Sequence, residues 1–111
     1  MEFNEAKIEI YVPQDYVIAL RDALSAVGAG HIGDYDHCVS ITQVTGYWRP
    51  LENAHPFNGE IGAICEGNEC KIEIRCKKEL IAEAVKVIKQ IHPYEEPVIN
   101  IVPLANDMYY V

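Results

Sequence analysis

Basic side chains are scarce in this sequence. Nine Lys and Arg residues stand against 17 Asp and Glu residues, and the formal net charge at pH 7 is −8. Binding to nucleic acid depends on neutralising phosphates with Lys and Arg. Binding to an anionic membrane surface depends on the same side chains. The charge balance therefore argues against both nucleic acid and a membrane surface as partners.

Long apolar runs are also missing. No stretch approaches the roughly 20 consecutive apolar residues that a membrane-spanning helix needs. The first five residues, Met-Glu-Phe-Asn-Glu, have neither the basic start nor the apolar centre of a signal peptide. We therefore expect a soluble, cytoplasmic protein.

Cysteine pairs with the spacing of a metal or redox motif are a third absence. The four cysteines are Cys38, Cys65, Cys70 and Cys76, and none of their spacings is Cys-x-x-Cys. In a reducing compartment we expect them to be thiols. If Gly67 and Asn68 formed a two-residue hairpin turn, Cys65 and Cys70 would face each other, and a disulfide between them would be geometrically possible.

What the sequence does contain is the hydrophobic patterning of a small α+β protein. Half of its 111 residues are apolar, which suits one domain, residues 1–111, with one modest core. Alternating apolar residues predict strands, and apolar residues at helical spacing predict helices. The predicted strands are 6–12, 38–48, 60–65, 70–76 and 98–104, with 60–65 hairpinned onto the next strand; the predicted helices are 14–27 and 79–91. The order β-α-β-β-α-β predicts a ferredoxin-like antiparallel sheet with two helices on one face.

The last predicted strand carries apolar residues on both of its faces. Two helices can cover only one face of the sheet, so the other face must meet water or a partner. Val98 and Val102 on that other face, together with Tyr109 near the end of the chain, predict a homo-oligomer in which sheets face one another.

The run Gly28–Cys38 concentrates three glycines and several polar side chains. Its Gly-x-Gly-x-x-Gly spacing follows a helix instead of opening one, which argues against a dinucleotide site; we expect Gly28 to end the first helix. His31, His37 and Cys38 are metal-ligand types, and zinc or copper would suit them. The alternative is that Asp34 and Asp36 form local turns and that the histidines bind backbone groups.

A second polar run follows the second helix, with the sequence His-Pro-Tyr-Glu-Glu-Pro at 92–97. His92 at a helix C-terminus is expected to be stabilised in its charged form. Tyr94 is expected to pack while its hydroxyl reaches a neighbour. The chain has no Ser-His-Asp pattern and no nucleophile elbow, and we assign no catalytic residue.

Trp48 and Arg49 stand at a predicted strand-to-loop junction. An exposed Trp-Arg pair often marks a recognition site. Burial at a subunit boundary is the other interpretation, and it is the one that we favour.

Four motifs follow one another along essentially the whole chain. They are Gly28–Cys38, Gly46-x-x-Arg49-Pro50-Leu51, Pro56-Phe57-x-Gly59-Glu60-Ile61-Gly62 and His92-Pro93-Tyr94-Glu95-Glu96. Together they resemble the insertion domain of the Nif-three-like dinuclear metal centre proteins. The segment from His92 to Pro97 also resembles the C-terminal motif of the CutA divalent-cation-tolerance proteins. Both resemblances imply a PII-like, ferredoxin-type fold, and because CutA and PII proteins are trimers they imply a homotrimer.

In the Nif-three-like family this domain interrupts a larger protein, and the two-metal site lies in flanking halves that this sequence lacks. The resemblance therefore implies a stand-alone copy of the insertion domain with a regulatory or accessory role. It gives no ground for carrying over a hydrolase or cyclohydrolase activity. The likeness to CutA implies divalent-cation binding, and the likeness to PII implies sensing of a small effector between subunits.

Our leading hypothesis is a non-enzymatic, cytoplasmic, trimeric protein that binds a divalent metal ion or a small ligand near the Gly28–Cys38 loop. The expected ligand-binding residues are His31, Asp34, Tyr35, His92, Tyr94 and Glu95; the expected metal ligands are His31, His37 and Cys38; the expected interface residues are Trp48, Arg49, Val98, Val102 and Tyr109. One alternative is a protein-interaction module that uses the loop 48–59. Another is an accessory fragment of a metal-dependent hydrolase. The leading hypothesis predicts that the two histidine motifs converge in one cleft.

Overall fold

The structure is a computed structural model that describes residues 2–110. Along the chain it has strand β1 (Glu5–Val12), helix α1 (Val17–Ala26), strands β2 (Ser40–Trp48) and β3 (Cys65–Lys77), helix α2 (Ile81–Ile91) and strand β4 (Ile99–Pro103). Short 3₁₀ turns at Gln14–Tyr16, Lys78–Leu80 and Asn106–Met108 flank these elements. The predicted order β-α-β-β-α-β is confirmed.

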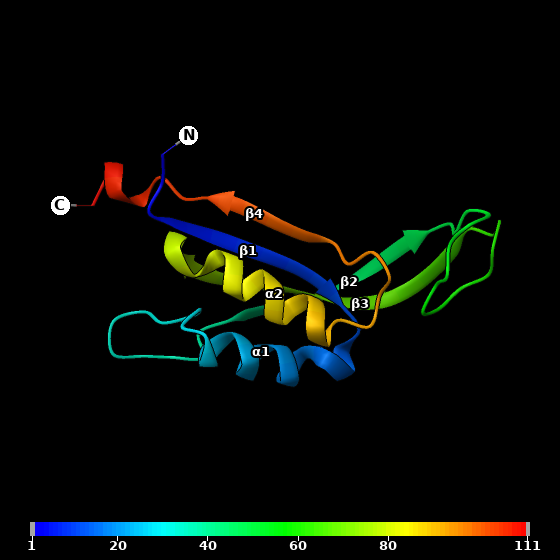
Figure 1. The fold of residues 1–111 in the computed structure, drawn as a ribbon, viewed down its shortest axis with the longest axis horizontal. Helices are drawn as coiled ribbons and strands as arrows, with labels where there is room; N and C mark the ends of the chain where they lie inside the picture. The colour runs from blue at the N-terminus through cyan, green and yellow to red at the C-terminus, as the bar shows by residue number, and fades with distance from the viewer. Residues whose placement is uncertain (1, 111) are drawn as a thin grey trace.

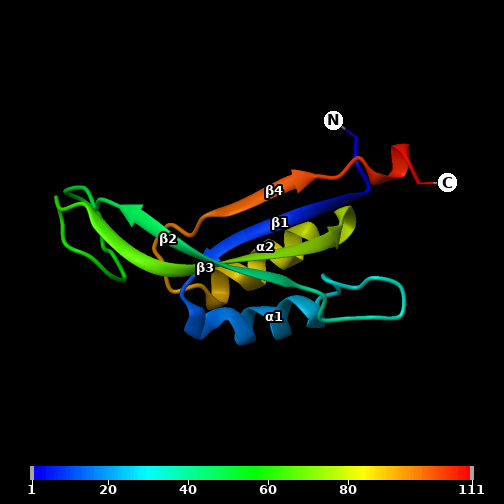
Figure 2. The same ribbon diagram turned by 180° about the vertical axis from the view of Figure 1, so that it is seen from behind.

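The four strands form one antiparallel sheet in the order β2-β3-β1-β4. Ile8 in the central strand β1 lies opposite Ile74 of β3 on one side and Ile101 of β4 on the other. Both helices lie against one face of this sheet (Figure 1; Figure 2). The α+β, ferredoxin-like fold class is therefore the observed one.

The core lies between the sheet and the two helices. Every second residue of β1 is completely buried because alternate side chains of a strand point to the same face. The largest buried side chains are Ile8, Ile10, Val12, Leu20, Leu24, Ile72, Ile74 and Ile88. Burying one Ile or Leu side chain stabilises a fold by about 1.5–3 kcal/mol, so this layer holds the helices on the sheet.

Helix α1 ends in a Schellman motif at the predicted glycine. Gly28 has φ +97°, in the left-handed region. The amide of Ala29 donates to the carbonyl of Leu24 and the amide of Gly28 donates to the carbonyl of Ser25, both at 3.0 Å. The stop at Gly28 is confirmed, and it directs the chain into the Gly28–Cys38 loop.

Strand β3 is longer than the sequence patterning predicts. Gly67 and Asn68 lie inside β3 and pair with Gly46 and Thr45 of β2, so the predicted turn at these residues and the predicted strand at 60–65 are both wrong. The chain instead reverses through the loop 49–64. Gly67 serves packing, since a Cβ there would lie 3.0 Å from the ring of Trp48.

The same register excludes the disulfide that we considered. Cys65 pairs with Trp48, whereas Cys70 lies opposite both Gln43 and Val12. Cys65 and Cys70 therefore stand five residues apart on one extended strand, beyond the reach of a disulfide. All four cysteines, which lie within the described part of the chain, are free thiols.

The face of the sheet away from the helices is charged at its centre. Lys7 Nζ lies 2.9 Å from Glu73 and 3.3 Å from Glu9, and Arg75 lies 2.8 Å from Glu5. The edge strand β4 adds an apolar residue to the open side, Val102, which is 38 % exposed. In the single chain, β4 is not buried on both faces as the sequence pattern suggests. Packing of this face on a partner stays a prediction.

The far ends of β2 and β3 form a two-stranded arm, residues 44–48 and 65–69. Strand β1 ends opposite Cys70, so the arm extends beyond the helices, and the molecule measures 51 × 29 × 23 Å (Figure 1). Within residues 2–110, no helix is long and apolar enough to cross a membrane.

Candidate functional site

The Gly28–Cys38 loop is tied to strand β3 by its backbone. The amide of Gly30 donates to the carbonyl of Arg75 at 2.8 Å, and the amide of Cys38 donates to the carbonyl of Gly30 at 3.0 Å. At the tip, Ile32 and Tyr35 exchange two backbone hydrogen bonds of 2.9 and 3.0 Å. The loop is thus closed by its own backbone.

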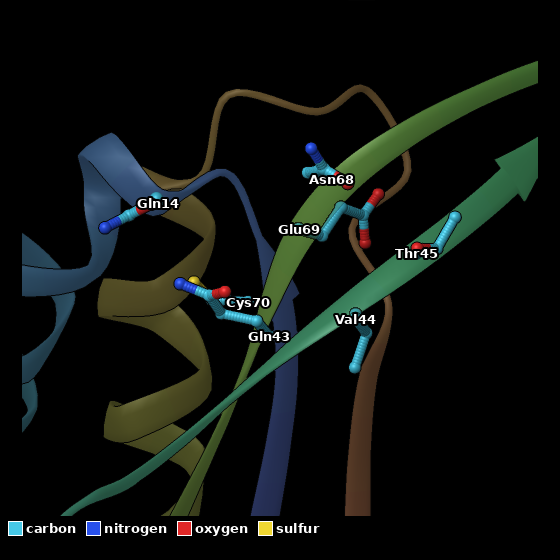
Figure 3. Close-up of a pocket in the computed structure, with 7 residues that line it drawn as sticks. All are labelled: Gln14, Gln43, Val44, Thr45, Asn68, Glu69 and Cys70. Atoms are coloured by element: carbon cyan, nitrogen blue, oxygen red, sulfur yellow. The ribbon is translucent and has the colours of Figure 1, made fainter.

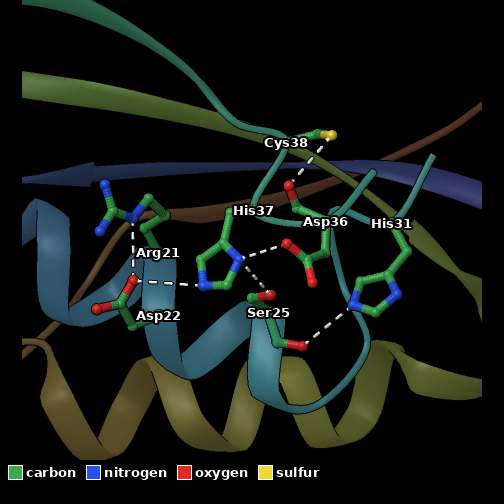
Figure 4. A network of polar contacts seen from close by, with 7 residues as sticks. All are labelled: Arg21, Asp22, Ser25, His31, Asp36, His37 and Cys38. Carbon is green, nitrogen blue, oxygen red and sulfur yellow. Dashed lines mark hydrogen bonds and ion pairs between the residues drawn. The ribbon is translucent and has the colours of Figure 1, made fainter. Parts of the chain in front are cut away.

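His37 stands at the centre of a polar network in this loop (Figure 4). Its Nδ1 lies 2.7 Å from Asp36 Oδ1 and 3.1 Å from Ser25 Oγ, and its Nε2 lies 3.6 Å from Asp22 Oδ1. The hydrogen bond with His37 lowers the pKa of Asp36. His37 has φ +56°, a left-handed conformation that is uncommon outside glycine.

The predicted metal ligands do not face one another in this loop. His31 Nε2 lies 3.3 Å from the carbonyl of Ser25, and the thiol of Cys38 donates to the carbonyl of Asp36 at 3.6 Å. In Figure 4 the Asp36 carboxylate lies between the two imidazoles. Among residues 2–110, no group of three or more His, Cys, Asp or Glu side chains is arranged to hold a metal ion. In this conformation His31, His37 and Cys38 do not fit one ion, and metal binding here stays a prediction.

The two histidine motifs lie at opposite ends of the helical layer. Gly30 is bonded to Arg75, which pairs with Lys7 near the start of β1, whereas His92 is bonded to Tyr11 near its end. The cause is topological: α1 and α2 run in opposite directions, so the segments that follow them emerge at opposite ends (Figure 1; Figure 2). The predicted ligand set is therefore divided. His31, Asp34 and Tyr35 lie at one end, and His92, Tyr94 and Glu95 lie at the other.

His92 is a buried residue that joins the turn after α2 to strand β1; it is not an exposed, charged cap of the helix. Only 7 % of the surface of His92 is exposed to solvent. Its Nε2–H donates to the carbonyl of Tyr11 at 2.6 Å, and its Nδ1 accepts the amide of Tyr94 at 3.2 Å. Burial lowers the pKa of His92. Nδ1 can accept a hydrogen bond only when the ring is neutral. The expectation of a charged His92 is therefore wrong, because desolvation outweighs the helix dipole here.

Tyr94 lies against the arm. Its hydroxyl donates to Glu69 Oε1 at 3.1 Å, and burial together with Glu69 raises its pKa to about 12. Its ring also packs on Phe57, with centroids 5.9 Å apart. The amide of His55 donates to Glu95 Oε1 at 2.9 Å, so the loop 49–64 and the turn after α2 are joined.

Trp48 holds the other side of that loop. Its indole Nε1–H donates to the carbonyl of Asn58 at 3.1 Å. The amide of Gly62 donates to the carbonyl of Pro50 at 2.8 Å. Gly59 has φ +109°, and a Cβ there would lie 2.8 Å from both Trp48 Nε1 and Cys65 Sγ. The loop is therefore packed closely on the indole.

Between these two attachments lies a groove of about 680 Å³, which we call the aromatic groove. Its chemically distinctive lining residues are Tyr11, Tyr47, Trp48, Arg49, Phe57, Glu69, Tyr94, Glu95, Glu96 and Val98. Its volume is that of a small-molecule site. Trp48, Arg49 and Val98, predicted as interface residues, belong to this groove. Val102 lies opposite Lys7 at the other end of β1, and the roles of Val102 and Tyr109 in an interface stay predictions.

Glu69 also lines a second, smaller hollow of about 310 Å³ (Figure 3). It is lined by Gln14, Gln43, Val44, Thr45, Asn68, Glu69 and Cys70. Because Glu69 lines both hollows, its carboxylate stands at the junction of the arm with the body of the sheet.

The sequence interpretation names Tyr94, Glu95 and the loop 48–59 but assigns them to different hypotheses. The structure brings them together in one groove. Tyr11, Phe57 and Glu69 were missed as lining residues. Phe57 carried a signal, because an aromatic residue in a proline-rich loop usually finds a packing partner. Glu69 carried none, since it lies in a segment interpreted as a turn.

The sequence of this chain is similar to those of known bacterial proteins. The chain is 37 % identical over 98 residues to the GTP cyclohydrolase 1 type 2 homolog of Bacillus subtilis, covering 88 % of this chain and 26 % of that protein. It is 40 % identical over 96 residues to the homolog of Mycobacterium leprae, covering 86 % and 25 %. The chain thus spans about a quarter of the length of the curated relatives that it matches.

Two solved structures show the same fold. The crystal structure of a Bacillus cereus protein related to NIF3 superposes with a TM-score of 0.82 at 32 % identity, covering 94 % of this chain and 26 % of that one. CutA1 from a psychrotrophic Shewanella superposes with a TM-score of 0.71 at 21 % identity, covering 94 % and 84 %. These matches support the resemblance to Nif-three-like and CutA proteins; a stand-alone state of the domain stays a prediction.

The family model described as CutA1 divalent ion tolerance protein matches residues 51–110. This segment is more than half of the 111 residues. It includes the second half of the arm, helix α2, strand β4 and most of the aromatic groove. The chain therefore belongs to the CutA1 divalent ion tolerance protein family.

Proposed function

We propose that this chain is a non-enzymatic regulatory or accessory module that binds a small ligand in the aromatic groove. The observation that carries the proposal is the joining of three separate chain segments around one hollow. The arm, the loop 49–64 and the turn after α2 meet there through the Tyr94–Glu69 and His55–Glu95 hydrogen bonds. Side chains held by such contacts are preorganised for binding, which lowers the entropy that a ligand must overcome.

The groove is a better candidate than the Gly28–Cys38 loop, which the sequence favoured. The loop binds its own polar groups: both imidazoles face Ser25, and His37 also faces Asp22 and Asp36. The groove instead presents aromatic rings around a space of small-molecule size. The cyclohydrolase named for the curated relatives is not part of the proposal, because this chain spans a quarter of their length.

The groove is tested by NMR on the ¹⁵N-labelled protein. Small water-soluble amines, alcohols and carboxylic acids are added one at a time, and amide and indole shifts are recorded. We expect at least one class to shift the Trp48 indole signal together with the amides of Tyr94 and Glu95, with the signals of residues 28–38 unchanged. Shifts confined to residues 28–38, or no saturable shift with any compound, would contradict the proposal.

We further propose that this single domain is cytoplasmic and assembles as a homotrimer. Exposed apolar side chains support an assembly; among them are Val98 just before β4, Val102 in β4 and Tyr109 near the end of the chain. The free thiols support a reducing compartment. Sedimentation equilibrium should give three times the chain mass, and a monomeric mass at all concentrations would reject the trimer. Cell fractionation tests the cytoplasmic location.

Metal binding at the Gly28–Cys38 loop is the second candidate function. The observation in its favour is His37, held in a left-handed conformation beside the carboxylates of Asp22 and Asp36. Calorimetric titration of the reduced protein with zinc and with copper tests it. Binding that both His31→Ala and His37→Ala abolish would establish the loop as a metal site, and binding that survives both would remove the loop from consideration.

A further inference from the structure

We infer that the aromatic groove selects a small organic cation, with a quaternary or protonated ammonium group as the recognised feature. The inference rests on the proposed function of the groove and specifies its ligand. It follows from two properties of the lining residues: the number of aromatic rings and the sign of the charges.

Aromatic rings come to the groove from four segments of the chain. Tyr11 ends β1, Tyr47 and Trp48 end β2, Phe57 lies in the loop 49–64, and Tyr94 follows α2. The Phe57 and Tyr94 rings already pack as a pair with centroids 5.9 Å apart. The negative faces of such rings attract cations, and several rings around one space are the usual means of binding quaternary ammonium groups.

The charged residues that line the groove also favour a cation as its ligand. Three carboxylates line it, those of Glu69, Glu95 and Glu96, against the single guanidinium of Arg49. Glu69 and Glu95 are held in place by hydrogen bonds from Tyr94 and from the His55 amide. A bound anion would meet these carboxylates with one compensating cation, which is why phosphates and carboxylates are disfavoured.

The size of the groove favours a small molecule over a protein segment as its ligand. Its volume of about 680 Å³ lies in the range of small-molecule pockets, roughly 300–1,000 Å³. The net charge of −8 adds a long-range attraction for cations. An ammonium ion with one short substituent would place its charge near the carboxylates and its methyl or methylene groups against the rings.

Comparing choline with its neutral carbon isostere, 3,3-dimethyl-1-butanol, distinguishes the effect of the ligand's charge on affinity from the effect of its shape. Trp48 is the only tryptophan of the chain and lines the groove, so its fluorescence reports occupancy. We expect choline to change this fluorescence saturably and to bind roughly tenfold more tightly than the isostere, since cation–π and carboxylate attraction are absent for the neutral compound.

Charge variants make the test specific to the groove. Glu69→Gln and Glu96→Gln should each weaken choline binding about threefold or more, with little effect on the isostere. Glu83→Gln, on the exposed side of α2, changes the net charge equally and should leave both affinities unchanged; circular dichroism checks that each variant is folded. Equal affinities for the two compounds would overturn the cation inference and leave the groove as a ligand site. Failure of both compounds, and of the NMR panel above, would overturn both proposals.

Discussion

Replacing Gly30 by alanine is expected to lower the free energy of unfolding by about 2–4 kcal/mol, the sum of two physical effects. Gly30 has φ +73°, which costs about 1–2 kcal/mol for a residue with a Cβ. The added methyl group would also lie 2.9 Å from Ile74 Cδ1 and 3.0 Å from the carbonyl oxygen of Cys38. The amide of the same residue, Cys38, donates the hydrogen bond to Gly30 that closes the loop, so the Cys38 carbonyl has little freedom to move. Urea denaturation at one fixed protein concentration measures the change.

Gly33→Ala is the matched control for this prediction. Gly33 lies in the same loop with φ +57°, and a Cβ there would have no atom within 4 Å. Its alanine variant keeps the backbone cost and removes the collision, so about 1–2 kcal/mol is expected. Equal losses for the two variants would show that the loop is not packed against Ile74 as described.

His92→Phe is the second substitution with a large expected effect. Phenylalanine preserves an aromatic ring beside Tyr94 but removes both polar contacts of the imidazole. The carbonyl of Tyr11 and the amide of Tyr94 lose their partners, and each unpaired buried group costs about 1–3 kcal/mol. We expect a loss of about 2–4 kcal/mol in denaturant, together with a shift of the Trp48 fluorescence maximum, because the turn that carries Tyr94 loses its attachment to β1.

The same substitution should alter how stability depends on pH. The pKa of His92 is lowered from its ordinary value of 6.5 by burial, so the unfolded chain binds the proton more readily than the folded chain. The contribution of His92 is therefore complete above pH 6.5 and is lost as the pH falls through the folded-state pKa. Between pH 7 and pH 5 the wild type should lose stability more steeply than His92→Phe. His55→Phe is the same change at an exposed histidine and should keep the wild-type slope of the free energy of unfolding against pH. Parallel slopes for all three proteins would contradict a buried, neutral His92.

The regular part of the fold was open to prediction from the sequence because its physical causes are local. Alternating burial fixes β1 and the inner half of β3, since one face of each strand meets the helices. The helix stop at Gly28 follows from the low cost of a left-handed glycine. The four-strand, two-helix order then leaves the ferredoxin-like fold as the natural arrangement.

The arm was not predictable in the same way, because its pairing has no buried face to show in the pattern. Gly67 and Asn68 are usual turn residues, yet they continue β3, where Gly67 leaves room for the Trp48 ring. A contact between residues 19 positions apart decided the conformation, and neither residue alone indicates it. Misplacing this turn also concealed Glu69, which lines the groove from the arm.

The division of the candidate site could have been foreseen. In the predicted order β-α-β-β-α-β the two helices must run in opposite directions, so the loops after them leave the layer at opposite ends. That argument alone separates His31 from His92. Which segments meet around Tyr94 could not be foreseen, since this depends on the path of the loop 49–64 and on its contacts with Trp48 and Glu95.

Nuclear Overhauser effects from bound choline show directly whether the aromatic groove holds an organic cation. We expect contacts from the choline methyl protons to the rings of Trp48, Phe57 and Tyr94, each lost when excess unlabelled competitor cation is added. Contacts to His31, His37 or Tyr35 instead would place the binding site at the Gly28–Cys38 loop and contradict the account. An absence of any contact at saturating choline would contradict it equally.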